Sequence, residues 1–214
     1  MPPTTDAANV AFLPWVRQGA AAALTTVDNL AATQNVPVKL TAALTVNRAP
    51  EVKVEVRLLG PGDVVGIDPQ QIVRTDPRPG SADFEPNYFP AIEFDRPDFP
   101  WLFTPAAADA TARLRPWLAL VVVRRQDGVH LRPPGEEPLP VLDIGKPARP
   151  ADELPDLAES WCWAHGQASR ASGIAIAAAL SGRPELSLSR LICPRLLAPD
   201  TDYIACVVPA FESG

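Results

Sequence analysis

The stretch DFEPNYFPAIEFDRPDFPWLFT, residues 83–104, decides the fold of this chain. It is dense in proline, aromatic and acidic residues and holds no lysine, serine or glycine, so its composition is not that of a flexible linker. Each of its four prolines removes a backbone donor and pushes the preceding residue toward extended geometry, which argues against a helix. The stretch therefore predicts a stiff, extended segment whose rings are buried, either in the core of this chain or against a partner.

The rings of this segment leave two alternatives open for its role. They pack in the chain's own core, or they belong to an ordered arm that packs on neighbouring subunits, since stiff loops lose little entropy on association. For the second alternative the anchors are aromatic, as is typical of interfaces: Phe84, Tyr88, Phe89, Phe99 and Trp101. Three arginines are expected to pair across the contact: Arg74, Arg78 and Arg96.

Five carboxylates lie within the same segment: Asp83, Glu85, Glu93, Asp95 and Asp98. Paired carboxylates beside aromatic rings can hydrolyse glycans if one is held protonated in an apolar pocket. A bound cation such as Ca²⁺ is a further alternative, although the spacing lacks the regular ligand pattern of a calcium loop. Structural pairing with the arginines of the chain is the interpretation that we favour.

Composition bounds the class of protein. The 214 residues carry a net charge of −6, with 47% hydrophobic residues and 26 prolines against 12 glycines. This balance predicts a single α+β domain over residues 1–214, with a loose N-terminal segment at about 1–11. No basic stripe exists in the sequence, so nucleic-acid binding has no electrostatic basis.

Cysteine usage indicates a reducing compartment. The three cysteines, Cys162, Cys193 and Cys206, are odd in number and far apart, which is not a disulfide framework. No signal peptide and no membrane-spanning run are evident, so we expect a cytoplasmic protein without membrane insertion. Cys162 and His165, three apart on a predicted helix, could form half of a zinc site, but a buried thiol and a hydrogen-bonded imidazole are favoured. We therefore expect no metal and no cofactor.

Alternating residues predict two strands, at 38–46 and 52–58, that form an antiparallel pair with one buried face. A continuous apolar run at 117–123 predicts a strand buried on both faces in the centre of a sheet, with a return at 129–131. A further strand is expected at 203–208.

Helices are expected after Pro14, to about residue 24, over 104–115, and from Pro155 through Ala168. The predicted fold class is α+β, a mostly antiparallel sheet with two or three helices and long ordered proline-rich loops. The chain has no G-x-S-x-G elbow and no glycine-rich phosphate loop, and only two histidines to serve as a base, so we predict a protein that is not an enzyme.

Several stretches together resemble a known group. They are LPWVRQG (13–19), GPGDVVGIDPQQIVRTDP (60–77), DFEPNYFPAIEFDRPDFPWLFTPA (83–106), RLRPWLALVVV (113–123) and LPDLAESWCWAHGQ (154–167). LICPRL (191–196) and YIACVVPAFESG (203–214) add to the similarity. The chain resembles largely uncharacterised proteins encoded beside phage-tail-like contractile injection systems in actinobacteria and other bacteria.

The resemblance implies a structural component of the particle, at the baseplate or in a cage around the spike. Its partners are then other particle subunits, such as baseplate, spike or sheath proteins, with multiple copies per particle. Relatives continue past the end of this sequence, so a C-terminal continuation beyond Gly214 is expected. The alternative function is a glycan-binding module or glycoside hydrolase that acts on the cell wall through residues 83–104.

Overall fold

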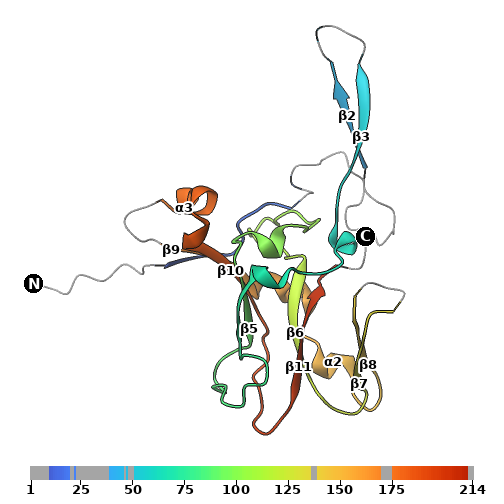
Figure 1. The fold of residues 1–214 in the computed structure, drawn as a ribbon, viewed down its shortest axis with the longest axis vertical. Coiled ribbons are helices and arrows are strands. Elements are labelled where there is room, and N and C mark those ends of the chain that lie inside the picture. Colours follow the sequence, from blue (N-terminus) through green and yellow to red (C-terminus); the bar gives the residue numbers. More distant parts are fainter. Residues whose placement is uncertain are drawn as a thin grey trace, which may run out of the picture.

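The structure is a computed structural model that describes residues 10–19, 22, 39–45, 47, 51–135, 139–169 and 175–211. Within these residues the chain is a sheet-rich α+β fold in which every strand pairing is antiparallel (Figure 1). The prediction of a mostly antiparallel sheet with few helices is confirmed. No helix in the described ranges has the length and apolar character needed to cross a bilayer.

The strands are β1 (Val10–Leu13), β2 (Lys39–Leu44), β3 (Val52–Arg57), β4 (Ile72–Asp76), β5 (Ala91–Phe94), β6 (Leu118–Arg124), β7 (Val129–Arg132), β8 (Val141–Ile144), β9 (Ala164–Ser169), β10 (Ser187–Ile192) and β11 (Tyr203–Pro209). The α-helices are α2 (Pro150–Glu153) and α3 (Ile176–Gly182). Short 3₁₀ helices are η1 (Pro61–Asp63), η2 (Pro69–Gln71), η3 (Phe99–Trp101), η4 (Leu157–Cys162) and η6 (Pro184–Leu186).

A five-stranded sheet with the order β1-β9-β10-β5-β4 organises the body. Alternate residues of β9 and β10 are buried, and the residues between them are half-exposed. This period of two is expected for a sheet with one face on the core. The buried face packs the core through Phe94, Leu191 and Ala164.

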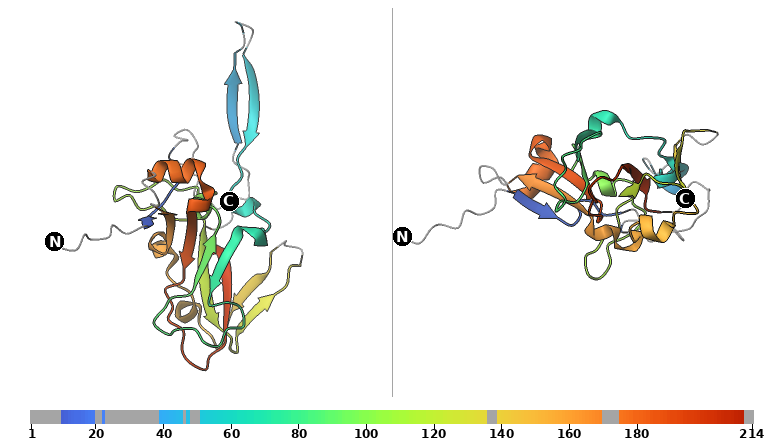
Figure 2. Two further views of the ribbon diagram at one scale, coloured as in Figure 1. Left: turned by 60° about the vertical axis from the view of Figure 1, so that its left-hand side comes forward. Right: turned by 90° about the horizontal axis from the view of Figure 1, so that it is seen from below.

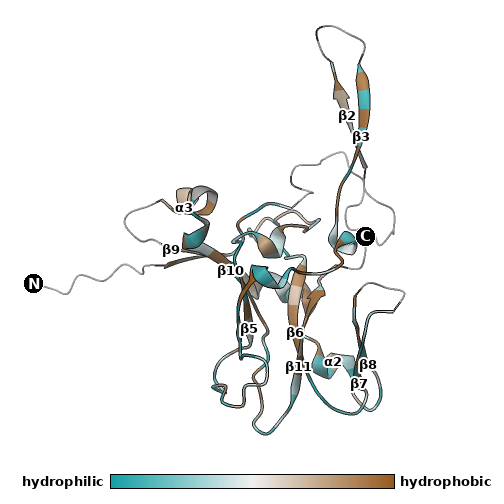
Figure 3. Cartoon of the chain, viewed as in Figure 1, coloured by the Kyte–Doolittle hydropathy of each residue, from teal (hydrophilic) through white to brown (hydrophobic). Residues whose placement is uncertain are grey.

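Strand β6 is buried on both faces. Leu118, Leu120 and Val122 point into the main core, while Val121 and Val123 pack with Val129 and Ala148 in a second cluster. This confirms the predicted burial, and Figure 3 shows β6 as an apolar strand. Its position in the centre of a sheet is wrong, because β6 pairs with β11 in a two-stranded sheet.

The second half of the 83–104 stretch builds the core. The ring of Phe99 stacks on that of Phe94 with centroids 4.4 Å apart. The indole N–H of Trp117 donates to the carbonyl oxygen of Phe99 over 2.7 Å. The backbone N–H of Trp117 donates to the carbonyl oxygen of Pro100 over 2.8 Å. The predicted extended geometry is wrong for Phe99–Trp101, because these residues form the 3₁₀ helix η3, which has a proline in its first turn.

Strands β2 and β3 form the predicted antiparallel pair, with Ala42 opposite Val54 and Leu44 opposite Val52. Both strands project away from the body in Figure 1 and in the left view of Figure 2. Every residue of β3 is exposed, so the prediction that one face of this pair is buried is wrong. Alternation of apolar and polar residues predicts a strand with one apolar face. It does not ensure that another part of the chain packs on that face.

The predicted helix over 104–115 is also wrong, because no helix occupies these residues. The Asp109 carboxylate accepts from the backbone N–H groups of Thr111, over 2.8 Å, and Arg113, over 3.0 Å. Such local side-chain bonds compete with helical ones. Thr104 is not a helix cap, since its hydroxyl donates to the carbonyl oxygen of Arg115 over 2.6 Å.

The predicted helix from Pro155 through Ala168 is a 3₁₀ turn, η4, followed by strand β9. The small residues Ala164, Gly166 and Ala168 alternate toward the core, where a β-carbon at Gly166 would overlap the Val16 side chain. Pairing of β9 with β1 and β10 overrides the local helical spacing, a common outcome when tertiary contacts compete with propensity.

Four smaller predictions concern chain ends and connections. Residues 10 and 11 belong to β1, so the loose segment does not extend to residue 11, and residues 1–9 lie outside the described ones. Residues 14–19 are not helical, whereas Ala22, the one described residue of 20–24, is helical. The strand at 129–131 exists as β7, but it pairs with β8 rather than β6, while β11 confirms the strand at 203–208.

Candidate docking face on the five-stranded sheet

A row of charged and polar side chains crosses the half-exposed face of the five-stranded sheet. Cross-strand register places Arg74 of β4 opposite Glu93 of β5, Glu93 opposite Arg190 of β10, and Arg190 opposite His165 of β9. Residues directly opposite in antiparallel strands share one face and lie in contact distance. Four strands that are far apart in sequence thus contribute one side chain each to a single row.

Glu93 is the centre of this row and is only 7% exposed. Its carboxylate is hydrogen-bonded to the guanidinium of Arg190, and its Oε2 lies 3.8 Å from the Nε of Arg74. A carboxylate with so little solvent requires such charged partners. The row therefore holds one anion between two cations, and Arg74, with a side chain 55% exposed, presents the outer charge to solvent.

His165 ends the row, in surroundings that disfavour its charged form. Burial lowers the pKa of its imidazole below the usual 6.5, and the adjacent Arg190 lowers it further, while Glu93 opposes them. Within the described chain, His165 Nε2 and Arg190 Nε are buried without a hydrogen-bond partner. Both atoms are already removed from solvent, so the fold itself bears the cost of leaving them unpaired.

Aromatic rings flank the row. Phe12 of β1 lies edge-on to His165 with centroids 5.2 Å apart, and Phe89 lies edge-on to Trp163 at 6.1 Å. Phe12 is 61% exposed, Tyr88 63% and Phe89 41%. We define the docking face as the row together with Phe12, Trp163 and the 76–90 segment that carries Tyr88 and Phe89. Exposed aromatic rings beside arginine are the composition of a protein interface.

The five aromatic anchors predicted from the sequence differ in their burial. Tyr88 and Phe89 are exposed and Phe84 is half-buried. Phe99, 4% exposed, and Trp101, fully buried, belong to the core, so their assignment as anchors for a partner is corrected. Their burial follows from η3, which turns both rings toward the start of β6.

The three predicted arginines are all exposed, with different surroundings. Arg74 contacts Glu93 and also Asp76, over 3.3 Å. Arg96 pairs with Asp98, two residues on, over 3.1 Å. Arg78 lies in the 76–90 segment after β4. Arg74 and Arg78 thus lie at the docking face, whereas the guanidinium of Arg96 is used within its own loop.

Four of the five carboxylates of the segment have identified partners. Glu93 and Asp98 pair with arginines, which confirms the favoured interpretation for these two. Asp83 accepts from the Ser81 hydroxyl over 2.6 Å, a hydrogen bond that lowers the pKa of the Asp83 carboxyl, and Glu85 accepts from Asn87 over 3.1 Å. A general acid needs a raised pKa instead, so this pairing does not favour glycan hydrolysis.

The two residues of the possible zinc half-site do not share a helix, contrary to the prediction. Cys162 ends η4, with its thiol 2.9 Å from the carbonyl oxygen of Glu159, while His165 lies in β9. Among the described residues, no three histidine, cysteine, aspartate or glutamate side chains converge as metal ligands would.

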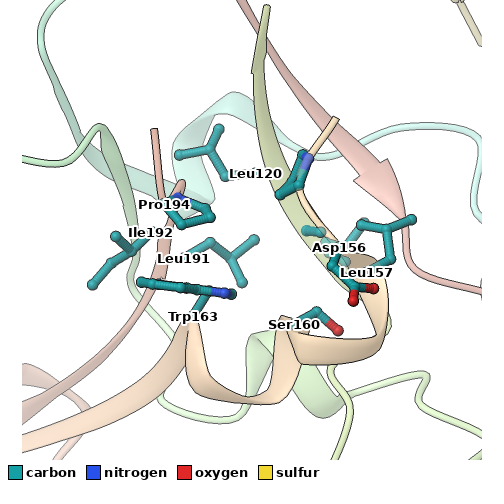
Figure 4. Close-up of a pocket in the computed structure, with 11 residues that line it drawn as sticks. Leu120, Asp156, Leu157, Ser160, Trp163, Leu191, Ile192 and Pro194 are labelled. Carbon is teal, nitrogen blue, oxygen red and sulfur yellow. The ribbon is translucent and has the colours of Figure 1, made fainter. Parts of the chain in front are cut away.

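A cavity beside η4 has a volume of about 10 Å³ (Figure 4). Its lining includes Leu120, Leu157, Trp163 and Leu191, with Ser160 at one side. A cavity of this volume holds about one water molecule. It is therefore far too small for a sugar ring or another organic substrate.

Sequence reasoning missed His165 as a member of the row and missed Arg190 and Trp163 altogether. Arg190 and Glu93 are 97 residues apart, and their contact depends on the register between β10 and β5. Nothing in the local pattern around Arg190 carries that register. The segment 187–192 reads SLSRLI and does not alternate between apolar and polar residues, so it gave no signal for the outward face of residue 190.

No family model matches this chain, and no curated protein and no solved structure is significantly similar to it. The role of the docking face is therefore inferred from its own residues and from the resemblance described above.

Proposed function

We propose that this chain is a structural, non-enzymatic component of a phage-tail-like contractile injection system. In this proposal it is assembled in the cytoplasm in multiple copies, at the baseplate or in a cage around the spike. The resemblance of the quoted stretches, of which residues 83–106 are the most specific, supports the assignment to such a particle. The docking face supports a role in contacts with neighbouring subunits.

The observation that carries the docking role is the pair of exposed rings, Tyr88 and Phe89, on the segment between β4 and β5, where Phe89 lies edge-on to Trp163. The backbone N–H of Tyr88 donates to the carbonyl oxygen of Glu85 over 3.0 Å, which closes a turn. One residue after Phe89, the carbonyl oxygen of the buried Pro90 accepts from Cys193 over 2.8 Å. Rings fixed in this way lose little further entropy when a partner covers them.

A pull-down with the full chain tests this proposal. Tagged protein is mixed with the baseplate, spike and sheath proteins encoded beside it, and retention is measured against protein concentration. We expect one or more of these to be retained, and the Tyr88→Ala/Phe89→Ala double variant to weaken retention at least about tenfold. Leu131→Ala, an exposed leucine on β7, is the matched control and should have no effect.

Two results would overturn the proposal. One is that no particle protein is retained by the wild-type chain. The other is that both variants behave alike, which removes the docking face from the contact. Co-sedimentation with peptidoglycan that is lost in Glu85→Gln would instead favour the glycan-binding alternative.

A further inference from the structure

The strand pair β2–β3, named here the arm, has one apolar face that remains exposed in the described part of the chain. Ala42 and Leu44 of β2 share that face with Val52, Val54 and Val56 of β3, as their register shows. The leucine is 54% exposed, and the three valines are 58%, 42% and 45% exposed in chain order. In Figure 3 the residues of β3 alternate between apolar and polar along its length.

This exposure is costly for a two-stranded element. A lone hairpin is marginally stable in water, and strands gain independent stability from a third strand or a packed face. Strands β2 and β3 pair with each other and with no further strand of the described chain. Each strand also has an open edge in the described chain, and the unpaired backbone groups of such an edge are a template for association. The arm therefore has the properties of an element that is covered by another molecule.

The charge of the arm indicates the chemistry of the molecule that covers it. Residues 39–57 carry four basic and two acidic side chains, a net charge of +2 in a chain whose total is −6. The 76–90 segment of the docking face carries three acidic residues and one arginine, a net charge of −2. Exposed rings lie in the same segment, so it offers both the charge and the apolar surface that complement the arm.

The arm and the 76–90 segment of one molecule cannot meet. In Figure 1 and in the left view of Figure 2 the arm projects from one end of the body, and the loop between β4 and β5 lies toward the other. Contact between them requires two copies. A contact between different surfaces of identical chains is heterologous, and it produces a ring or a filament according to its rotation.

We propose that the arm of one copy docks on the 76–90 segment of a second copy. This inference rests on the docking role proposed above and names one partner of that face. Arm-to-arm packing is a weaker alternative, because both arms would carry a net charge of +2 and would repel each other.

Complementation between two variants tests the heterologous contact. Val52→Ser/Val54→Ser removes apolar surface from the arm, and Tyr88→Ser/Phe89→Ser removes it from the 76–90 segment, without any change of charge. Analytical ultracentrifugation of the full chain at about 100 µM measures the assembly state, a range suited to contacts of micromolar affinity. Circular dichroism checks that each variant keeps the fold.

We expect wild-type protein to associate and each double variant alone to be monomeric, with association weakened at least about tenfold. An equimolar mixture of the two variants should form one-to-one dimers, because one copy retains its arm and the other its docking segment. Leu131→Ser/Val141→Ser, exposed on the β7–β8 pair, should associate as the wild type does.

Other outcomes overturn the inference. Association that survives in the 76–90 variant but not in the arm variant indicates arm-to-arm packing. Monomeric wild-type protein shows that no second copy covers the arm, while retention of baseplate proteins in the pull-down would leave the proposed particle role intact. If the wild-type chain associates with itself but retains no particle protein in the pull-down, the particle role alone is overturned.

Discussion

Two antiparallel strand pairs of this chain have similar geometry and opposite surroundings. Strand β6 of the pair β6–β11 is buried on both faces from Leu118 to Val123, while every residue of β3 in the arm is exposed. Both pairs have long, regular registers. The apolar run of β6 and the alternation of β3 each specify a strand. What differs is whether other elements of the chain pack on the strand.

The comparison assigns different roles to apolar residues. In β6–β11 they hold the fold, because both core clusters depend on them. In the arm they contribute little to the stability of the isolated chain and are available to a partner. Apolar burial contributes about 25 cal/mol per Å² only where surface is removed from water, so the same side chain has different effects at the two places.

A matched pair of leucine truncations should give the largest difference. Leu120→Ala in β6, 7% exposed, is expected to lower the free energy of unfolding by about 2–5 kcal/mol. Leu44→Ala in the arm, 54% exposed, should change it by less than about 0.5 kcal/mol. Urea unfolding followed by circular dichroism measures both. Equal losses would contradict the division between core and arm.

Glu153 should give the next largest effect, because its buried carboxylate binds the backbone at the end of β6. Its carboxylate accepts from the backbone N–H of Arg124 over 2.9 Å, from Gln126 and from Arg195, each over 2.8 Å. Glu153→Gln should lower the free energy of unfolding by about 1–3 kcal/mol. Asp127→Asn, exposed in the following turn, is the control and should have little effect.

The dependence of the free energy of unfolding on acidic pH should reflect the same carboxyl group. Burial raises the pKa of Glu153, but the Arg124 N–H, Arg195 and Gln126 outweigh it and the net pKa is lowered. A lowered pKa contributes stability that is present above the unfolded value, near 4.5, and is lost as pH falls through the folded value. Glu153→Gln should remove this contribution, and an unchanged acid profile would contradict it.

His165 should give a smaller effect in a different pH window. Burial, aided by Arg190, lowers its pKa below 6.5, so the unfolded chain takes up a proton more readily than the folded one. Stability should therefore decrease as pH falls from about 6.5. Thermal melts of His165→Gln should lack this decrease, whereas His130→Gln, exposed on β7, should keep it. A decrease that persists in both variants would assign it to other groups.

The strands could be predicted from the sequence wherever one pattern was compatible with one structure. The alternation around Val54 and the apolar run around Val121 each specified a strand, and the structure contains both. The helices failed because their signals were local. The Asp109 side chain diverts its backbone from a helix, and the small residues around Gly166 fit a strand as well as a helix.

The candidate site was predictable only in part. Exposed Tyr88 and Phe89 came from composition, but the same reasoning also selected Phe99 and Trp101, which are core. Aromatic content alone does not distinguish the two fates. The charged row centred on Glu93 could not be derived, because cross-strand register joins residues from four strands and no local pattern encodes it.

The most direct test of the account is hydrogen exchange of the full chain at low and high protein concentration. We predict fast exchange in β2 and β3 at low concentration, and slow exchange in β6 at any concentration. At high concentration, protection should rise together in the arm and in the 76–90 segment. Exchange in the arm that is independent of concentration, or already as slow as in β6, would contradict the claim that a second copy covers it.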